Sequence, residues 1–142
     1  MQILGIDYGQ AKIGLALGST DSRLAEPWKI IRYKDIAILH EKITQLIKEE
    51  RIEKVVVGVS DGVIGKESKQ FGNDLASRIK IPVEFQDETL TSKDAQRLAI
   101  EAGIQRKKRK GMEDAHSAAL ILQTWLDEQT LPLPGKQSKQ QH

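Results

Sequence analysis

The 142-residue sequence predicts a single α/β domain with a five-stranded mixed sheet flanked by helices. Two observations lead to this prediction. The chain opens with two short segments of strand character separated by a glycine-containing turn, and it continues with apolar runs that alternate with segments of helical spacing. A hairpin followed by strand–helix alternation indicates a sheet with both antiparallel and parallel pairs.

The first hairpin is predicted in residues 3–18, which read ILGIDYGQAKIGLALG. The bulky β-favouring residues at its start, and the alternation of large and small residues after the turn at Gly9, are typical of strands. A third strand is expected over residues 28–33 (WKIIRY), after a connection over residues 19–27. Three strands so close in sequence predict an antiparallel meander.

Helices and strands are predicted to alternate in the next part of the chain. Asp35 is a candidate N-cap for a helix that carries apolar residues at helical spacing. Residues 54–59 (KVVVGV) predict a strand covered on both faces, and residues 60–66 (SDGVIGK) predict a loop. A second helix is expected to stop before Pro82, and residues 83–86 predict a fifth strand.

Two more helices are predicted towards the end of the chain. Residues 91–102 predict a helix that Gly103 ends. Residues 114–128 predict another helix, because apolar residues gather on one face: Ala115, Ala118, Ala119, Leu122, Trp125 and Leu126. The polar composition of residues 129–142 predicts a disordered tail, so the domain is expected to span residues 1–128.

The composition excludes several classes of protein. The absence of Cys excludes disulfides, thiolate zinc sites and a Cys nucleophile. No apolar run is long enough to span a bilayer and no signal segment opens the chain, so a cytoplasmic protein without a membrane partner is expected. The net charge of +2 is small, but residues 106–110 (RKKRK) concentrate positive charge in one block.

Acidic residues stand at the ends of three predicted elements. Asp7 ends the first strand, Asp87 and Glu88 follow the fifth, and Asp114 lies in the first turn of the last helix. Ligands gather beyond the carboxyl ends of parallel strands, so these acids are candidates for one site. Several ionised carboxylates need a strong counter-charge, and oxygen ligands suit Mg²⁺ or Mn²⁺, which can drive phosphodiester cleavage.

Each acid also has a purely structural interpretation. Asp7 can cap a hairpin turn, and Asp87 or Glu88 can cap the helix that follows. Asp114 can be stabilised by the dipole at a helix N-terminus. For Asp7 alone the two interpretations are balanced, and for Asp87, Glu88 or Asp114 alone the structural one is stronger, whereas the positions together favour a metal site.

Basic residues are candidates for binding a phosphate backbone. The block consists of Arg106, Lys107, Lys108, Arg109 and Lys110, and it closely precedes Asp114. Lys12, just past the first turn, can extend this surface. A solvated loop is the alternative interpretation of the block. No aromatic residues are interleaved with it, so base stacking is not predicted, and no Ser–His–Asp pattern supports a nucleophilic hydrolase.

Five segments resemble the YqgF family, in the same order along the chain: GIDYG at 5–9, VVVGV at 55–59, DETLTS at 87–92, EAG with the basic run at 101–110, and DAHSAALILQ at 114–123. The resemblance implies an RNase H-like fold and a bacterial cytoplasmic nuclease that uses a divalent metal. It also implies that Asp7, Glu88 and Asp114 are both the catalytic acids and the metal ligands. The family is tied to maturation of the 5′ end of precursor 16S rRNA and to Holliday junctions.

The sequence departs from the family pattern at two places. Thr89 stands where the family usually has Arg, which removes an expected phosphate contact, and Val59-Ser60 stands where it usually has Leu-Pro. Neither change removes a carboxylate. A catalytically weak nucleic-acid-binding protein of ribosome assembly is the main alternative function. A monomer would suffice for RNA trimming, whereas a junction resolvase needs two sites and hence a homodimer.

Overall fold

The computed structural model describes residues 1–60, 62–88 and 113–130, which form one five-stranded sheet and three helices. The strands lie in the order β3-β2-β1-β4-β5. Both β1–β2 and β2–β3 are antiparallel, whereas β1–β4 and β4–β5 are parallel, so the predicted mixed sheet is confirmed. In chain order the elements are β1 (Gln2–Asp7), β2 (Lys12–Ser19), β3 (Ala25–Arg32), α1 (Ile36–Glu49), β4 (Lys54–Val59), α2 (Gly62–Arg78), β5 (Val83–Asp87) and α5 (Glu113–Thr130).

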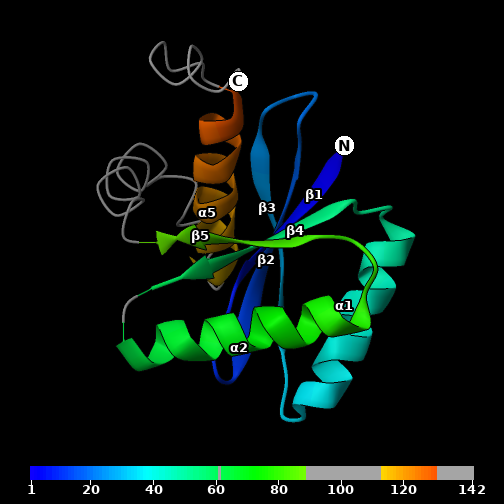
Figure 1. Ribbon diagram of the computed structural model, residues 1–142, viewed down its shortest axis with the longest axis vertical. Helices are drawn as coiled ribbons and strands as arrows, with labels where there is room; N and C mark the ends of the chain where they lie inside the picture. Colours follow the sequence, from blue (N-terminus) through cyan, green and yellow to red (C-terminus); the bar gives the residue numbers. More distant parts are fainter. Residues whose placement is uncertain (61, 89–112, 131–142) are drawn as a thin grey trace.

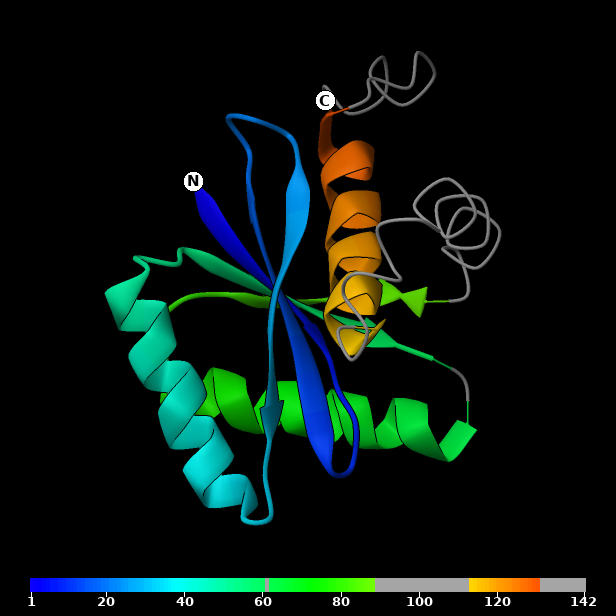
Figure 2. The same cartoon turned by 180° about the vertical axis from the view of Figure 1, so that it is seen from behind.

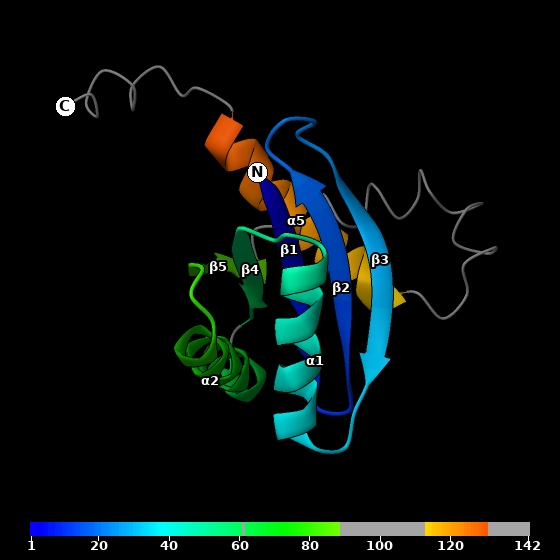
Figure 3. The ribbon, with the colours of Figure 1, turned by 90° about the vertical axis from the view of Figure 1, so that its right-hand side faces the viewer.

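The helices cover both faces of the sheet. Helices α1 and α2 lie on one face and α5 crosses the other, as the two opposite views show (Figures 1 and 2). The view in Figure 3 separates the layers, with α1 and α2 on one side of the strands and α5 behind them. Each face buries its own apolar core, and side chains of β1 and β4 enter both. Burial on both faces explains why 54–59 is a continuous apolar run.

The predicted start of α1 is confirmed in atomic detail. Asp35 is in an extended conformation, and its Oδ1 accepts a hydrogen bond of 2.8 Å from the backbone N–H of Ala37. This bond satisfies one of the amide groups that a helix leaves unpaired at its N-terminus. The helix ends at Glu49, and Arg51 then takes a left-handed conformation with φ of 55° as the chain turns into β4.

Strand β3 starts three residues earlier than predicted, because a distant side chain pairs with its first residue. The N–H of Ala25 donates to Oε1 of Gln123, at 2.9 Å, and Nε2 of Gln123 donates to the carbonyl of Arg23. Pro27 lies inside the strand, which is tolerated because β3 is at the edge of the sheet. The ladder between β2 and β3 shifts register opposite Leu15 and Ala16.

Helix α2 begins at Gly62, so the loop predicted over residues 60–66 is wrong for residues 62–66. Two glycines so close together are typical of a turn, but Gly65 is a packing residue. A Cβ atom on Gly65 would collide with the backbone carbonyl of Ser60, so only glycine allows the first turn of α2 to close onto the end of β4.

The last helix also extends beyond its predicted end. Helix α5 reaches Thr130, so residues 129 and 130 are helical although their polar composition predicts a tail. All six residues of its predicted apolar face are buried. The helix predicted over residues 91–102, the basic block at 106–110 and the rest of the tail lie outside the described residues. Within the described part of the chain, no helix has both the length and the apolarity needed to cross a membrane.

Candidate active site

Asp7 emerges on the face of the sheet that α5 covers. Side chains alternate between the two faces along a strand. In β1, Ile3 packs in the core beneath α5, whereas Leu4 and Ile6 pack in the core beneath α1 and α2. Asp7, the last residue of the strand, therefore follows Ile3 and Gly5 onto the α5 face, at the carboxyl end of β1.

The same alternation separates the two acids at the end of β5. Glu84 lies on the α5 face, since Nε1 of Trp125 donates to its Oε1 at 3.0 Å. Phe85 lies on the opposite face, where its ring closely approaches the backbone of Gly72 in α2. By the same alternation, the side chain of Asp87 lies on the α2 side of the sheet and that of Glu88 lies on the α5 side. Glu88, and not Asp87, thus shares a face with Asp7.

A glycine leaves room between these two acids. The parallel register of β1 and β4 ends with the pair Ile6 and Val57, so Asp7 and Gly58 occupy the next position along. A Cβ atom on Gly58 would lie 3.0 Å from Cγ of Glu88 and would collide with the side chain of Ile121. The absence of a side chain at Gly58 therefore lets Glu88 lie over the end of β4, towards Asp7.

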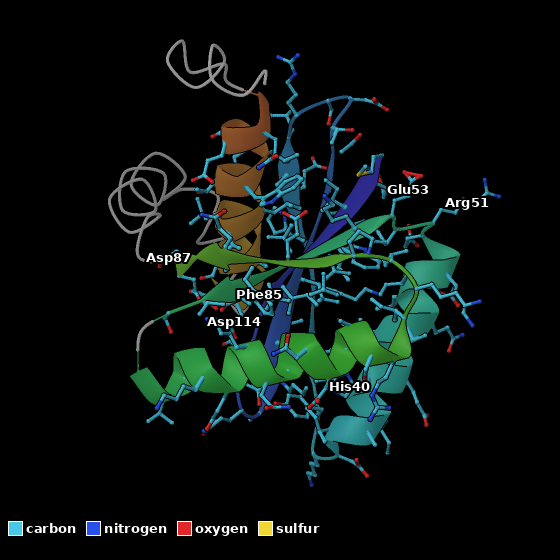
Figure 4. The ribbon with its side chains drawn as sticks, in the orientation of Figure 1. His40, Arg51, Glu53, Phe85, Asp87 and Asp114 are labelled. Atoms are coloured by element: carbon cyan, nitrogen blue, oxygen red, sulfur yellow. The ribbon has the colours of Figure 1, made fainter. Side chains whose placement is uncertain are left out.

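Asp114 is brought to the same place by a close contact between α5 and β2. A Cβ atom on Gly14 would overlap the backbone carbonyl of Asp114, so the first turn of α5 rests directly on the strand. Gly5 and Gly18 lie on the same face, and Cβ atoms there would come within 2.8 Å of side-chain atoms of Leu122. Because these three glycines have no side chains, α5 packs directly against the backbone of β1 and β2. Figure 4 shows Asp114 and Asp87 on the left side of the sheet and Arg51 and Glu53 on the right.

The charges at this end of the sheet act on one another. Burial raises the pKa of Asp7 to about 7, and the negative charges of Glu88 and then Asp114 contribute to the same rise. The pKa of Glu88 is also raised, mainly by burial and further by the charge of Asp87. The structure thus brings together the three acids that the sequence singled out, although their separation along the chain is large.

Lys12 neutralises one of these acids in the folded chain. Its Nζ lies 3.2 Å from Oδ2 of Asp114. The three carboxylates offer only oxygen donors, the set that Mg²⁺ and Mn²⁺ prefer. Yet among the described residues no three acidic or histidine side chains are grouped tightly enough to hold a metal ion as they stand. A shared ion would therefore require the carboxylates to reorient and Lys12 to release Asp114.

The turn that follows Asp7 is fixed by contacts that sequence reasoning missed. The hydroxyl of Tyr33 donates to the carbonyl of Gly9 at 2.5 Å, and the N–H of Tyr33 donates to the carbonyl of Ala11 at 3.0 Å. Nε2 of Gln10 donates to Oε1 of Glu67 in α2 at 2.9 Å. These partners are distant in sequence, so no local pattern predicts them. The common face of Gly5, Gly14 and Gly18 is the sequence signal that could have predicted where α5 packs on the sheet.

Comparisons with known proteins agree over nearly the whole chain. A family model for RuvX, described as Holliday junction resolvase, matches residues 1–128. A protein of Syntrophomonas wolfei named "Putative pre-16S rRNA nuclease" is 35% identical over 133 residues, covering 89% of this chain and 94% of that relative. A protein of Caldanaerobacter subterraneus with the same name is 38% identical over 136 residues, covering 91% and 98%.

Solved structures with low sequence identity share the fold. RuvC of T. thermophilus, in complex with a Holliday junction substrate, superimposes with a TM-score of 0.67 at 14% identity, covering 91% of this chain and 96% of RuvC. The Fowlpox virus resolvase, in complex with Holliday junction DNA, gives a TM-score of 0.62 at 13% identity, covering 92% and 100%. The predicted RNase H-like fold is therefore confirmed.

Proposed function

The chain belongs to the RuvX family, also called YqgF, and from this membership and the site we propose that it is a metal-dependent nuclease acting on the 5′ end of precursor 16S rRNA. The relatives at 35–38% identity that carry the pre-16S rRNA nuclease name support the substrate. The enzyme class is a hydrolase that cleaves phosphodiester bonds.

One observation carries the assignment of the site. Asp7 is partly buried, and its pKa of about 7 reflects both that burial and two neighbouring carboxylates from other elements. Burying acids next to one another is costly unless a cation joins them. A perturbed carboxylate at the carboxyl end of a parallel strand is a typical feature of a functional site.

The three acids have related roles in this proposal. Asp7, Glu88 and Asp114 would hold Mg²⁺ or Mn²⁺ through their carboxylate oxygens. The ion, when bound, would activate a water molecule and stabilise the leaving oxygen of the phosphodiester. Asp7 has the central place, because the negative charges of both other acids raise its pKa. Lys12 would exchange its contact with Asp114 for a contact with the phosphate backbone.

A second substrate is favoured by the description of the family and by the fold. The RuvX model is described as Holliday junction resolvase. A resolvase cuts two strands and therefore needs two copies of the site, which requires a homodimer. The RNA reaction needs one copy, so a monomer suffices.

The test offers both substrates to the same protein. Purified protein is incubated in Mn²⁺, and in parallel in EDTA, with a labelled four-way DNA junction and with a labelled RNA that spans the 5′ end of 16S rRNA. We expect Mn²⁺-dependent cleavage of the RNA. Symmetric nicks in the junction alone would shift the assignment to the second substrate. Failure to cut either substrate in Mn²⁺ would leave the catalytically weak binding protein as the better description.

The basic block is expected to add affinity and not chemistry. Replacing both Lys107 and Lys108 with Ala should lower the slope of log Kd against log salt by about 0.7 for each phosphate of a single strand that the variant no longer binds. Salt titrations of RNA binding measure this slope. The matched control replaces two exposed lysines on helices α1 and α2, Lys48 and Lys69, and should leave the slope unchanged. Equal slopes for the two double variants would show that the block is merely solvated.

A further inference from the structure

Two cations face each other across β2 and β3 beside the acids. Lys12 and Arg32 are directly paired in the antiparallel ladder, at the end of both strands. Residues that are directly opposite in a ladder project to the same face of the sheet. Lys12 reaches Asp114 in the first turn of α5, so the Cα–Cβ bond of Arg32 is also directed to the α5 face. Like charges at paired positions are destabilising, which calls for an anion between or above them.

Among the residues that the structure describes, only one of the two cations has an acidic partner. Lys12 pairs with Asp114 at 3.2 Å, whereas Arg32 is exposed and forms no ion pair with another described residue. The other basic side chain nearby on β3, that of Lys29, is directed to the opposite face. Lys29 is paired with Leu15, which packs in the core beneath α1 and α2, and its Nζ lies 4.4 Å from the ring centre of Trp28. Arg32 is therefore the available cation on this face of β3.

The position of Arg32 relative to the acids is fixed by the backbone. The next residue, Tyr33, donates two hydrogen bonds to the turn between β1 and β2, at 2.5 Å to Gly9 and at 3.0 Å to Ala11. The end of β3 and the turn after Asp7 are thus joined as one unit. A side chain on a fixed backbone loses less conformational freedom when it binds a ligand.

The order of the strands places the positive charges to one side of the negative ones. Glu88 follows β5, Asp7 ends β1, Lys12 begins β2 and Arg32 ends β3 at the sheet edge. Adjacent strands are about 4.8 Å apart, so β3 lies roughly 10 Å from β1. This distance is short enough for one substrate strand to contact both the acids and Arg32.

We propose that Arg32, together with Lys12, binds a backbone phosphate of the substrate strand close to the bond that is cut. The inference rests on the proposed function, because the nuclease site sets the path of the substrate strand. That path runs from the acids across β2 to β3. The ligand is a phosphodiester of nucleic acid, and the guanidinium group binds it through paired N–H donors. Arg32 acts in binding and takes no part in the chemistry.

The test compares Arg32→Gln with a matched Arg51→Gln control. Arg51 is exposed and lies on the opposite side of the view from Asp114 (Figure 4). The probe is the labelled RNA spanning the 5′ end of 16S rRNA, bound in EDTA at several salt concentrations. Arg32→Gln should weaken binding about fivefold at 0.1 M salt and lower the salt slope by about 0.7, the value for one contact to a single strand. Arg51→Gln should match the wild type, and Arg32→Lys should recover the salt slope but only part of the affinity, because an ammonium group lacks the paired N–H donors.

Cleavage in Mn²⁺ separates this inference from the proposed function. If the wild type cuts the RNA, Arg32→Gln should raise KM with little change in kcat, as expected when an interaction used only for binding is removed. A wild type that binds the RNA without cutting it would defeat the nuclease proposal, and the salt slopes would still decide the role of Arg32. Identical affinity and slope for Arg32→Gln and Arg51→Gln would overturn the inference, as would a wild type that does not bind the RNA.

Discussion

Asp7→Asn should abolish Mn²⁺-dependent cleavage while making the metal-free protein more stable. The loss of rate should be roughly a hundredfold or more, because the substitution removes a charge from a proposed ligand of the cation. The gain in stability has a different cause. Asp7 is partly buried beside Glu88 and Asp114, so its ionised form is unfavourable in the folded chain without a metal. Asn keeps the size of the side chain and carries no charge.

The pH dependence follows from the direction of the shift. The pKa of Asp7 is about 7 in the folded chain against an ordinary value of 3.8, so the folded state binds this proton more tightly. The free energy of unfolding should therefore fall as the pH rises from about 4 to about 7 and then remain low, a loss on the order of a few kcal/mol. Asp7→Asn should remove this contribution and be more stable than the wild type at pH 8.

Thermal melts in EDTA from pH 4 to pH 8, paired with cleavage assays in Mn²⁺, measure both effects. Asp35→Asn is the matched control, because Asn is as good an N-cap as Asp and the residue lies at the start of α1. It should leave the cleavage rate unchanged. An Asp7→Asn protein that melts much lower than the wild type yet cuts at the same rate would show that Asp7 only caps a turn.

Gly14→Ala should reduce both stability and cleavage, because β2 and α5 touch at this residue. A Cβ atom there would overlap the carbonyl of Asp114, and backbone cannot move aside as a flexible side chain can. The first turn of α5 must lift from the sheet, which should cost about 1–3 kcal/mol, the range for overpacking. Asp114 would move with it, away from Asp7. Small displacements of catalytic groups are sufficient to cause large losses of rate.

A control of similar stability distinguishes displacement of Asp114 from general weakening of the fold. Ile43 is buried in the core beneath α1, on the opposite face from Asp114, and Ile43→Val should cost about 1 kcal/mol. Denaturant melts measure the stability of both variants, and cleavage is assayed well below their melting temperatures. Gly14→Ala should lose cleavage while Ile43→Val keeps it. Equal activity in the two variants would mean that the contact at Gly14 does not position the site.

Local patterns predicted the strands and the buried face of α5 because these depend on periods of two and of about four residues. The start of α2 could not be predicted in this way. Gly65 is present for its contact with Ser60, and a glycine selected for packing looks the same in sequence as one selected for a turn. The start of β3 depends on Gln123, nearly a hundred residues away, and this contact appears only in the folded chain.

The candidate site, like the fold, could be predicted from the sequence only in part. Acids at the ends of elements were visible in sequence, and the resemblance to a family selected Asp7, Glu88 and Asp114 from among them. The structure adds the physical reason for choosing Glu88 over Asp87, which is the alternation of β5 fixed by the contacts of Glu84 and Phe85. The pairing of Lys12 with Asp114 could not be predicted, because it depends on how closely α5 approaches Gly14.

The irregular edge of the sheet bears on how two copies of the chain can associate. Strand β3 carries Pro27 and a register shift beside Ala16. Pro27 has no N–H to donate and the shift increases the local twist, so this edge is a poor template for another strand. Two molecules should therefore not join through a continuous sheet at β3, which protects the chain against edge-to-edge aggregation. A dimer able to cut both strands of a junction would have to form through a different surface.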